Sequence, residues 1–67
     1  MFTPMEKVVL GVLVENEGWL VTYIEFAKAD PGLDNKNAIA VYVHRLRKLI
    51  KGKITTVRGF GYIYDRS

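Results

Sequence analysis

The sequence predicts a small α+β domain in which three helices are followed by a C-terminal β-hairpin. Three observations predict it: two helix-start signals within the first 25 residues, a long amphipathic pattern over residues 35–51, and two short β-rich segments within residues 53–65. A chain of 67 residues can build one hydrophobic core. We therefore expect residues 1–67 to form a single domain.

The first helix is expected to begin after Thr3. The run Thr3-Pro4-Met5-Glu6 has threonine at the N-cap, proline at the first helical position and glutamate at the third, which together form a capping box. The helix should continue to Glu15 or Asn16, and Gly18 is available to end it in a left-handed conformation. Its core-facing residues at helical spacing are Met5, Val8, Val9, Val12 and Leu13.

A short strand and a short second helix should follow. Trp19-Leu20-Val21 is apolar enough for one strand, and Thr22-Tyr23-Ile24-Glu25 repeats the capping-box pattern. Val21 before this cap and Phe26 inside the helix form a hydrophobic staple. Because proline cannot continue a helix, Asp30-Pro31-Gly32 should end it.

The third helix is predicted over about residues 35–51, with Asp34 or Asn35 as its cap and Gly52 after its end. At about 100° per residue, one apolar stripe must face the core. That stripe consists of Ile39, Tyr42, Val43, Leu46, Leu49 and Ile50. The opposite face carries Asn37, Val41, His44 and Lys48, flanked by Ala40, Arg45 and Lys51.

The last part of the chain predicts a hairpin over residues 53–65. Lys53 to Val57 and Tyr62 to Asp65 are rich in β-branched and aromatic residues, and Arg58-Gly59-Phe60-Gly61 joins them. The order of helix, short strand, helix, helix and hairpin is typical of a winged helix-turn-helix domain, in which the hairpin is the wing.

Composition excludes several functional classes. The chain has no cysteine and His44 is its only histidine, which excludes disulfides and zinc fingers and leaves no metal site to expect. The sequence holds no nucleophile with a partner base and no phosphate-binding glycine motif, so we expect no catalytic residue, no cofactor and no enzyme. It has neither an apolar run of the ~18 residues that span a membrane nor a secretory signal, which predicts a cytoplasmic protein.

The charges are divided unevenly along the chain. Residues 1–35 carry two basic and six acidic side chains, a net charge of −4, whereas residues 36–67 carry eight basic and one acidic, a net charge of +7. Such a division within one small domain favours a polyanion as the partner of the second half. A soluble protein with unevenly distributed surface charge would show the same numbers.

The outer face of the third helix indicates which kind of polyanion the second half of the chain binds. The run from His44 to Lys48 taken alone is also typical of a solvated helix face. The same helix adds Asn37, whose amide can pair with adenine, and Val41, which can meet a thymine methyl. Arg58 in the hairpin turn could reach a narrow minor groove. Binding to double-stranded DNA explains this mixture of side chains better than a need for solubility alone.

Three segments resemble the effector domain of OmpR/PhoB-type response regulators. Residues 40–48, AVYVHRLRK, are similar to the recognition helix of that family, and residues 54–62, ITTVRGFGY, to its wing; residues 2–6, FTPME, resemble the opening of its first helix. The resemblance implies a sequence-specific DNA-binding regulator of transcription, with the third helix in the major groove and the wing near the minor groove. The DNA-contacting positions it implies are Asn37, Val41, Tyr42, His44, Arg45 and Arg47 on the helix and Thr56, Arg58 and Tyr62 on the wing, with Arg45 as the base-reading arginine. The cluster of basic side chains around the third helix adds Lys36 and Lys48 as expected DNA contacts.

The chain also departs from the family pattern. Because two residues come before Thr3, we expect neither a receiver domain nor the family's N-terminal four-stranded sheet, and we expect the loop that meets RNA polymerase in activators to have shrunk to about residues 29–34. Asn37 and Ala40 replace a common arginine and a common aspartate. These differences predict a stand-alone module, as in a small phage or plasmid regulator.

The first helix is more apolar than one core requires. Leu10 and Val14 remain on one side after the core positions have been assigned, so we expect an exposed patch for self-association or for a protein partner. The alternative is that Phe2, Trp19, Tyr64 or the hairpin covers them. The competing function is therefore that of a winged-helix module that binds another protein through the first helix.

Overall fold

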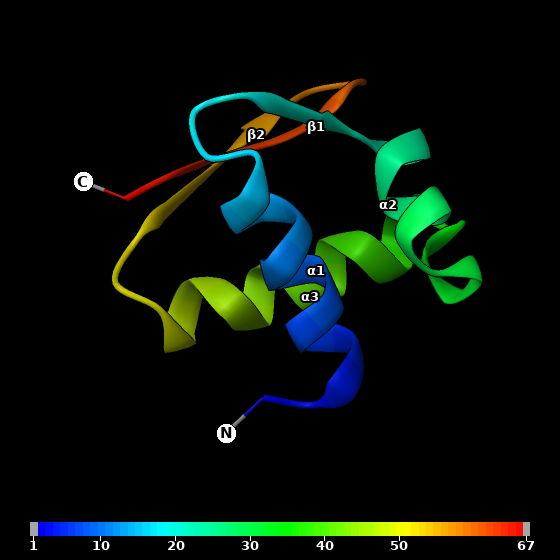
Figure 1. Cartoon of the computed structure of the whole chain (residues 1–67), viewed down its shortest axis with the longest axis horizontal. Helices are drawn as coiled ribbons and strands as arrows, with labels where there is room; N and C mark the ends of the chain where they lie inside the picture. Colours follow the sequence, from blue (N-terminus) through cyan, green and yellow to red (C-terminus); the bar gives the residue numbers. More distant parts are fainter. Residues whose placement is uncertain (1, 67) are drawn as a thin grey trace.

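Three helices and a three-stranded antiparallel sheet surround one core in the computed structural model, which describes residues 2–66 (Figure 1). The helices are α1 (Pro4–Glu15), α2 (Tyr23–Ala29) and α3 (Lys36–Leu49), with a 3₁₀ turn η1 (Pro31–Leu33) between the last two. The strands are β1 (Leu20–Thr22), β2 (Lys53–Val57) and β3 (Gly61–Asp65). The predicted class, a three-helix domain with a C-terminal hairpin, is confirmed.

Helix α1 begins with the expected capping box. The Thr3 N–H donates to the Glu6 carboxylate at 2.9 Å, and the Glu6 N–H donates to the Thr3 hydroxyl at 3.3 Å. The helix ends at Glu15, and Gly18 then takes a left-handed conformation with φ of 83°. The Gly18 N–H donates to the Tyr64 carbonyl at 2.8 Å, which ties the end of α1 to β3.

The segment from β1 to η1 follows the predicted order with small shifts. Strand β1 starts at Leu20, one residue later than expected. At the start of α2 the Thr22 N–H donates to the Glu25 carboxylate at 3.2 Å. Val21 and Phe26 are fully buried, as expected of a hydrophobic staple. The turn η1 was not foreseen as a 3₁₀ element, and its Leu33 is also fully buried.

Helix α3 is capped by Asn35, whose side-chain oxygen accepts hydrogen bonds from the N–H groups of Asn37 and Ala38. Ile39, Val43 and Leu46 are buried, as predicted. Leu49, which was assigned to the same stripe, is 47% exposed. At about 100° per residue it lies about 90° from the line through the three buried residues, so the predicted stripe was too wide.

The sheet has the order β1-β3-β2, so the hairpin strand β2 is an edge strand. In the hairpin Ile54 lies opposite Tyr64, and Thr56 lies opposite Tyr62. The side chains of Ile54, Tyr62 and Tyr64 join the core, and β1 adds Val21. The hairpin is therefore held to the helices through one face of the sheet.

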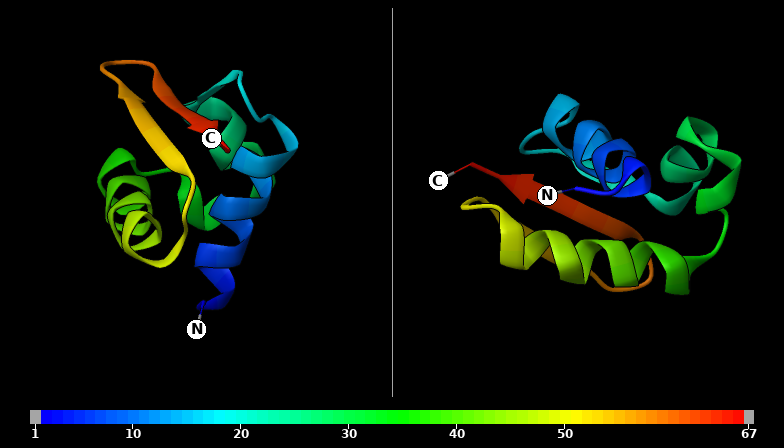
Figure 2. Two further views of the ribbon diagram at one scale, coloured as in Figure 1. Left: turned by 90° about the vertical axis from the view of Figure 1, so that its left-hand side faces the viewer. Right: turned by 90° about the horizontal axis from the view of Figure 1, so that it is seen from below.

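Helix α3 and the wing together form one side of the molecule. Both views in Figure 2 show α3 and the hairpin on one side and α1 on the other. Within residues 2–66 no helix has the length and apolar character needed to cross a membrane.

Candidate nucleic-acid interface

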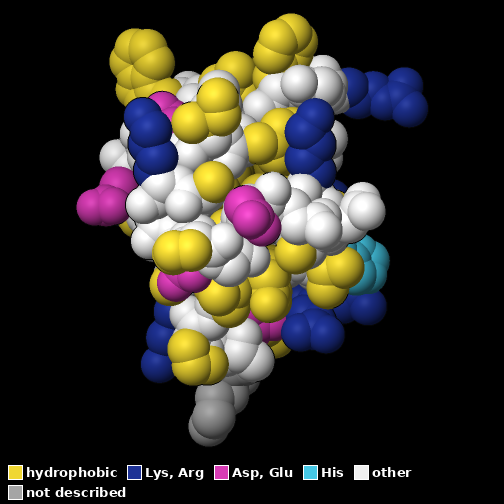
Figure 3. Space-filling model, turned by 90° about the vertical axis from the view of Figure 1, so that its right-hand side faces the viewer, with side chains coloured by type: hydrophobic (Ala, Val, Ile, Leu, Met, Phe, Trp, Pro, Cys, Tyr) yellow, Lys and Arg dark blue, Asp and Glu magenta, His cyan; other side chains and the backbone are white. Residues whose placement is uncertain are grey.

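The outer face of α3 is open to solvent. Asn37, Val41, His44 and Lys48 are all exposed, with 49% of Val41 accessible. Figure 3 views the molecule from the α2 side, and in it the single histidine lies along one edge together with Lys and Arg side chains. Because the buried stripe of α3 faces α1 and the sheet, this face is free for a ligand as large as a nucleic acid.

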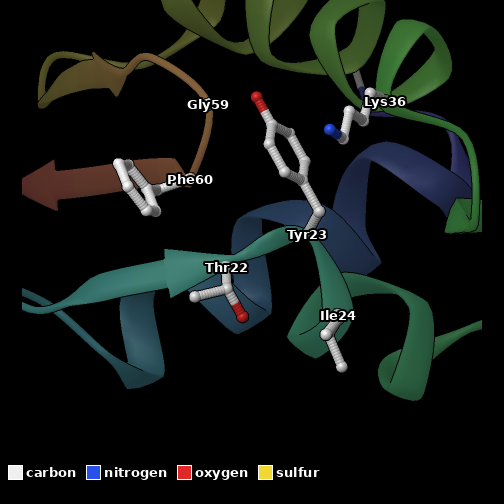
Figure 4. Close-up of a pocket in the computed structure, with 6 residues that line it drawn as sticks. All are labelled: Thr22, Tyr23, Ile24, Lys36, Gly59 and Phe60. Atoms are coloured by element: carbon white, nitrogen blue, oxygen red, sulfur yellow. The ribbon is translucent and has the colours of Figure 1, made fainter.

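Lys36 lies at the start of α3, on the side toward the wing. Its ammonium group is 5.0 Å from the centre of the Tyr23 ring, within the range of a cation–π interaction. Tyr23 and Lys36 line a surface hollow of about 370 Å³ together with Thr22, Ile24, Gly59 and Phe60. Figure 4 shows the Tyr23 ring between Lys36 and Phe60. This contact limits where the Lys36 charge can lie.

Arg45 lies on the opposite flank of α3, next to the start of α1. Its guanidinium is 3.8 Å from the Glu6 carboxylate, and the side chains are 55% and 4% exposed respectively. Glu6 also accepts the Thr3 N–H, so this buried carboxylate has both a hydrogen-bond donor and a cation beside it. At 3.8 Å the contact is too long for a hydrogen bond, but moving Arg45 away would leave the buried Glu6 carboxylate without its cation, which carries a cost.

Arg47 bends toward the hairpin while remaining exposed to solvent. Its Nε and Nη2 donate to the Ile54 carbonyl at 3.1 and 2.8 Å, and Nη2 also donates to the Thr56 hydroxyl at 2.8 Å. The resemblance implied separate DNA contacts for Arg47 and Thr56, whereas in this structure the two side chains bind each other. Arg47 thus connects α3 to β2, whereas the resemblance implied a DNA contact for it.

The hairpin turn projects from the domain beside the start of α3. The Phe60 N–H donates to the Val57 carbonyl at 3.0 Å, which closes the turn over Arg58 and Gly59. Arg58 is exposed, and 62% of Phe60 is accessible. Arg58 therefore carries a positive charge at the tip of the wing.

The two tyrosines that were expected to contact DNA are wholly or partly buried. Tyr62 is only 5% exposed, and its ring makes edge-to-face contacts with Tyr23 and Phe26 at centroid distances of 6.1 and 6.3 Å. Burial, with a smaller contribution from Tyr23, raises the pKa of the Tyr62 phenol above 10.0. Tyr42 is half-buried against the core. The Tyr62 ring has almost no surface to offer DNA, because strand alternation turns it toward the helices.

The first helix offers less free apolar surface than expected. Leu10 is half-buried and packs against the core, whereas Val14 is 43% exposed. Trp19, in the turn after α1, is also exposed, at 75%. The apolar surface at this end of the molecule therefore involves Val14 and Trp19 more than Leu10.

The exposed face of α3 and the hairpin turn together indicate the class of protein. A basic, exposed third helix on a three-helix core, flanked by a β-hairpin with a cationic turn, is the arrangement of a winged helix-turn-helix DNA-binding domain. The family model described as "Transcriptional regulatory protein, C terminal" matches residues 1–64. The chain belongs to this family, the OmpR/PhoB-type C-terminal DNA-binding domains of transcriptional regulators, which are not enzymes.

Individual relatives agree with the family. The chain is 34% identical over 70 residues to the transcriptional regulatory protein TctD of Salmonella typhimurium, in strains SL1344 and LT2 alike; the match covers 96% of this chain and 31% of the relative. It spans about a third of the length of these curated relatives. The solved C-terminal domain of the nisin resistance regulator NsrR, a lantibiotic response regulator, superposes with a TM-score of 0.79 at 26% identity, covering 100% of this chain and 76% of that one.

Proposed function

We propose that this domain binds double-stranded DNA in a sequence-specific manner, with α3 in the major groove and the wing near the adjacent minor groove. The observation that carries the proposal is that the exposed outer face of α3 and the cationic turn of the hairpin lie on the same side of the molecule (Figure 2). A DNA duplex laid against that side would meet both.

The outer face of α3 has the chemistry for reading bases. A 14-residue helix is about 21 Å long and, with its side chains, about 10–12 Å wide, which fits a major groove about 12 Å wide. The Asn37 amide suits adenine, and Val41 suits a thymine methyl. Arg45 would reach guanine after leaving Glu6, and His44 would add a hydrogen bond to a base edge or a phosphate.

The lysines around this face suit the phosphate backbone. Lys36 and Lys48 on α3 are exposed, as are Lys51 after the helix and Lys53 at the start of β2. Arg47 uses three of its five donors on β2 and retains two on Nη1 for a phosphate. Phosphate contacts fix the register of the protein on the duplex but carry no sequence information.

The wing would then lie along the minor groove. Arg58 is placed at its tip, and a narrow A·T-rich minor groove has the negative potential that attracts arginine. We assign no DNA contact to the Tyr62 ring because of its burial, and none directly to Thr56, whose hydroxyl accepts from Arg47.

Selection of bound duplexes from a random DNA pool at two salt concentrations tests this function. A recovered consensus that survives at the higher salt supports sequence-specific binding, and recovery of random sequences at both would contradict it. Arg45→Ala should change the ranking of selected sites and cost about 1–3 kcal/mol on the best one. Lys48→Ala, the matched control, should weaken all sites about equally.

A second candidate function is self-association through the end of α1. The observation that favours it is the exposure of Val14 and Trp19 at this end of the molecule. Two copies joined there could place two recognition helices on adjacent half-sites. Because Leu10 packs against the core, Val14→Glu is the better test. Sedimentation velocity should show a dimer for the wild type and a monomer for the variant, and a wild-type monomer would refute the idea.

A further inference from the structure

We infer that Arg47 is a positioning residue that fixes the hairpin relative to α3, so that helix and wing meet DNA as one rigid unit. The inference rests on the proposed function and adds a mechanism to it. In this mechanism the value of Arg47 comes from setting the distance between the two groove-binding elements, beyond any contact of its own with a phosphate.

The geometry of the Arg47 fork carries the inference. Nε and Nη2 share the Ile54 carbonyl at 3.1 and 2.8 Å, and Nη2 reaches the Thr56 hydroxyl at 2.8 Å. The two acceptors are the backbone carbonyl of Ile54 and, two residues further along β2, the side-chain hydroxyl of Thr56. A planar guanidinium held at three points defines both the separation and the orientation of strand and helix.

The hairpin needs such a connection because β2 is an edge strand. Its one strand neighbour is β3, and the backbone groups along its other edge have no strand partner. The Ile54 side chain anchors the base of β2 in the core, but Thr56 is exposed. Arg47 therefore extends the attachment of the hairpin from its buried base toward the turn that carries Arg58.

The position of Arg47 on α3 agrees with this role. At about 100° per residue, Arg47 lies on the flank of the helix, next to Lys48 on the outer face and beside Leu46 in the core. A residue on this flank can reach the hairpin without taking space from the outer face. Its positive charge also lies close enough to Tyr62, beneath the hairpin, to oppose part of the rise in the pKa of that phenol.

A preorganised wing strengthens binding because less conformational entropy is lost when the complex forms. Arg47→Lys keeps the positive charge but loses the planar fork, so it separates positioning from phosphate attraction. Thr56→Val removes one of the three hydrogen bonds, and Thr56→Ser retains that hydroxyl and serves as its matched control.

The first measurement is a double-mutant cycle in DNA affinity. The dissociation constants of the wild type, Arg47→Lys, Arg58→Ala and the double variant are measured on one selected duplex by fluorescence anisotropy. If Arg47 positions the wing, Arg58→Ala should cost much less in the Arg47→Lys background, with a coupling of more than about threefold. Effects that multiply within about twofold would show that Arg47 acts only as a phosphate contact and would overturn the inference.

The second measurement uses the protein without DNA, so that it holds even if the proposed function fails. Backbone ¹⁵N order parameters for residues 57–60 should be about 0.85 in the wild type and in Thr56→Ser, lower in Thr56→Val, and lowest in Arg47→Lys. Unchanged order parameters in Arg47→Lys would overturn the inference. Absence of specific DNA binding by the wild type, with the order parameters falling as expected, would refute the proposed function but leave the positioning role intact.

Discussion

Raising the salt concentration should weaken DNA binding steeply, because the proposed interface sets lysine side chains against phosphates. Four exposed lysines border the outer face of α3 and the start of β2: Lys36, Lys48, Lys51 and Lys53. At about −0.9 per phosphate contact they give a slope of log affinity against log salt of about −3.6, and a contact from Arg47 would bring it to about −4.5. A rise from about 50 to about 200 mM KCl then lowers the association constant about 150-fold or more.

Fluorescence anisotropy with one duplex over a series of KCl concentrations measures this slope. Lys48→Ala should make the slope shallower by about 0.9, because one counterion fewer is released. Lys7→Ala is the matched control, since Lys7 is exposed on α1, outside the proposed surface, and its loss should leave the slope unchanged. A wild-type slope shallower than about −1, or equal slopes for the two variants, would refute the placement of phosphates along α3.

Three further predictions concern stability, each measured by urea unfolding. Glu6→Ala should cost about 1–2 kcal/mol because it removes the acceptor of the Thr3 N–H and leaves a small cavity, whereas Glu6→Gln keeps that hydrogen bond and should cost less than half as much; equal losses would contradict this. Gly61→Ala should cost about 2 kcal/mol or more, because a Cβ would overlap the backbone carbonyl of Val21, and a neutral effect would show that β1 can move away. Burial raises the pKa of Tyr62 above 10.0, so the phenol ionises at a lower pH in the unfolded chain than in the native one. The free energy of unfolding should therefore be constant in this respect below about pH 10 and fall as the pH rises toward the native pKa. Tyr62→Phe should make this fall shallower.

Local signals were sufficient to predict most of the fold. The capping box at Thr3 and Glu6 defines the start of α1, and Asn35 defines the start of α3, because both caps act within three residues along the chain. The hairpin bounds followed from β-branched and aromatic content, except that β3 begins at Gly61, one residue before the predicted Tyr62. The stripe of α3 was predicted too wide at Leu49, which lies about 90° from the line through Ile39, Val43 and Leu46 and is 47% exposed.

The site was predicted less completely, because its interactions join residues that are far apart in the chain. The Glu6–Arg45 pair links α1 to α3, and the hydrogen bonds from Arg47 to β2 depend on how the hairpin folds back. No local sequence pattern indicates either contact. Tyr62 is different. Its spacing of two from Tyr64 places both rings on one face of β3, so strand alternation could have indicated its burial.

Methylation interference on a selected duplex tests whether α3 reads the major groove while the wing lies near the adjacent minor groove. Dimethyl sulfate modifies guanine N7 in the major groove and adenine N3 in the minor groove. We expect N7 methylation to block binding within the core of the site and N3 methylation to block it at one flank. Arg58→Ala should remove only the effect at the flank. Binding that is insensitive to N7 methylation throughout the site would contradict the claim.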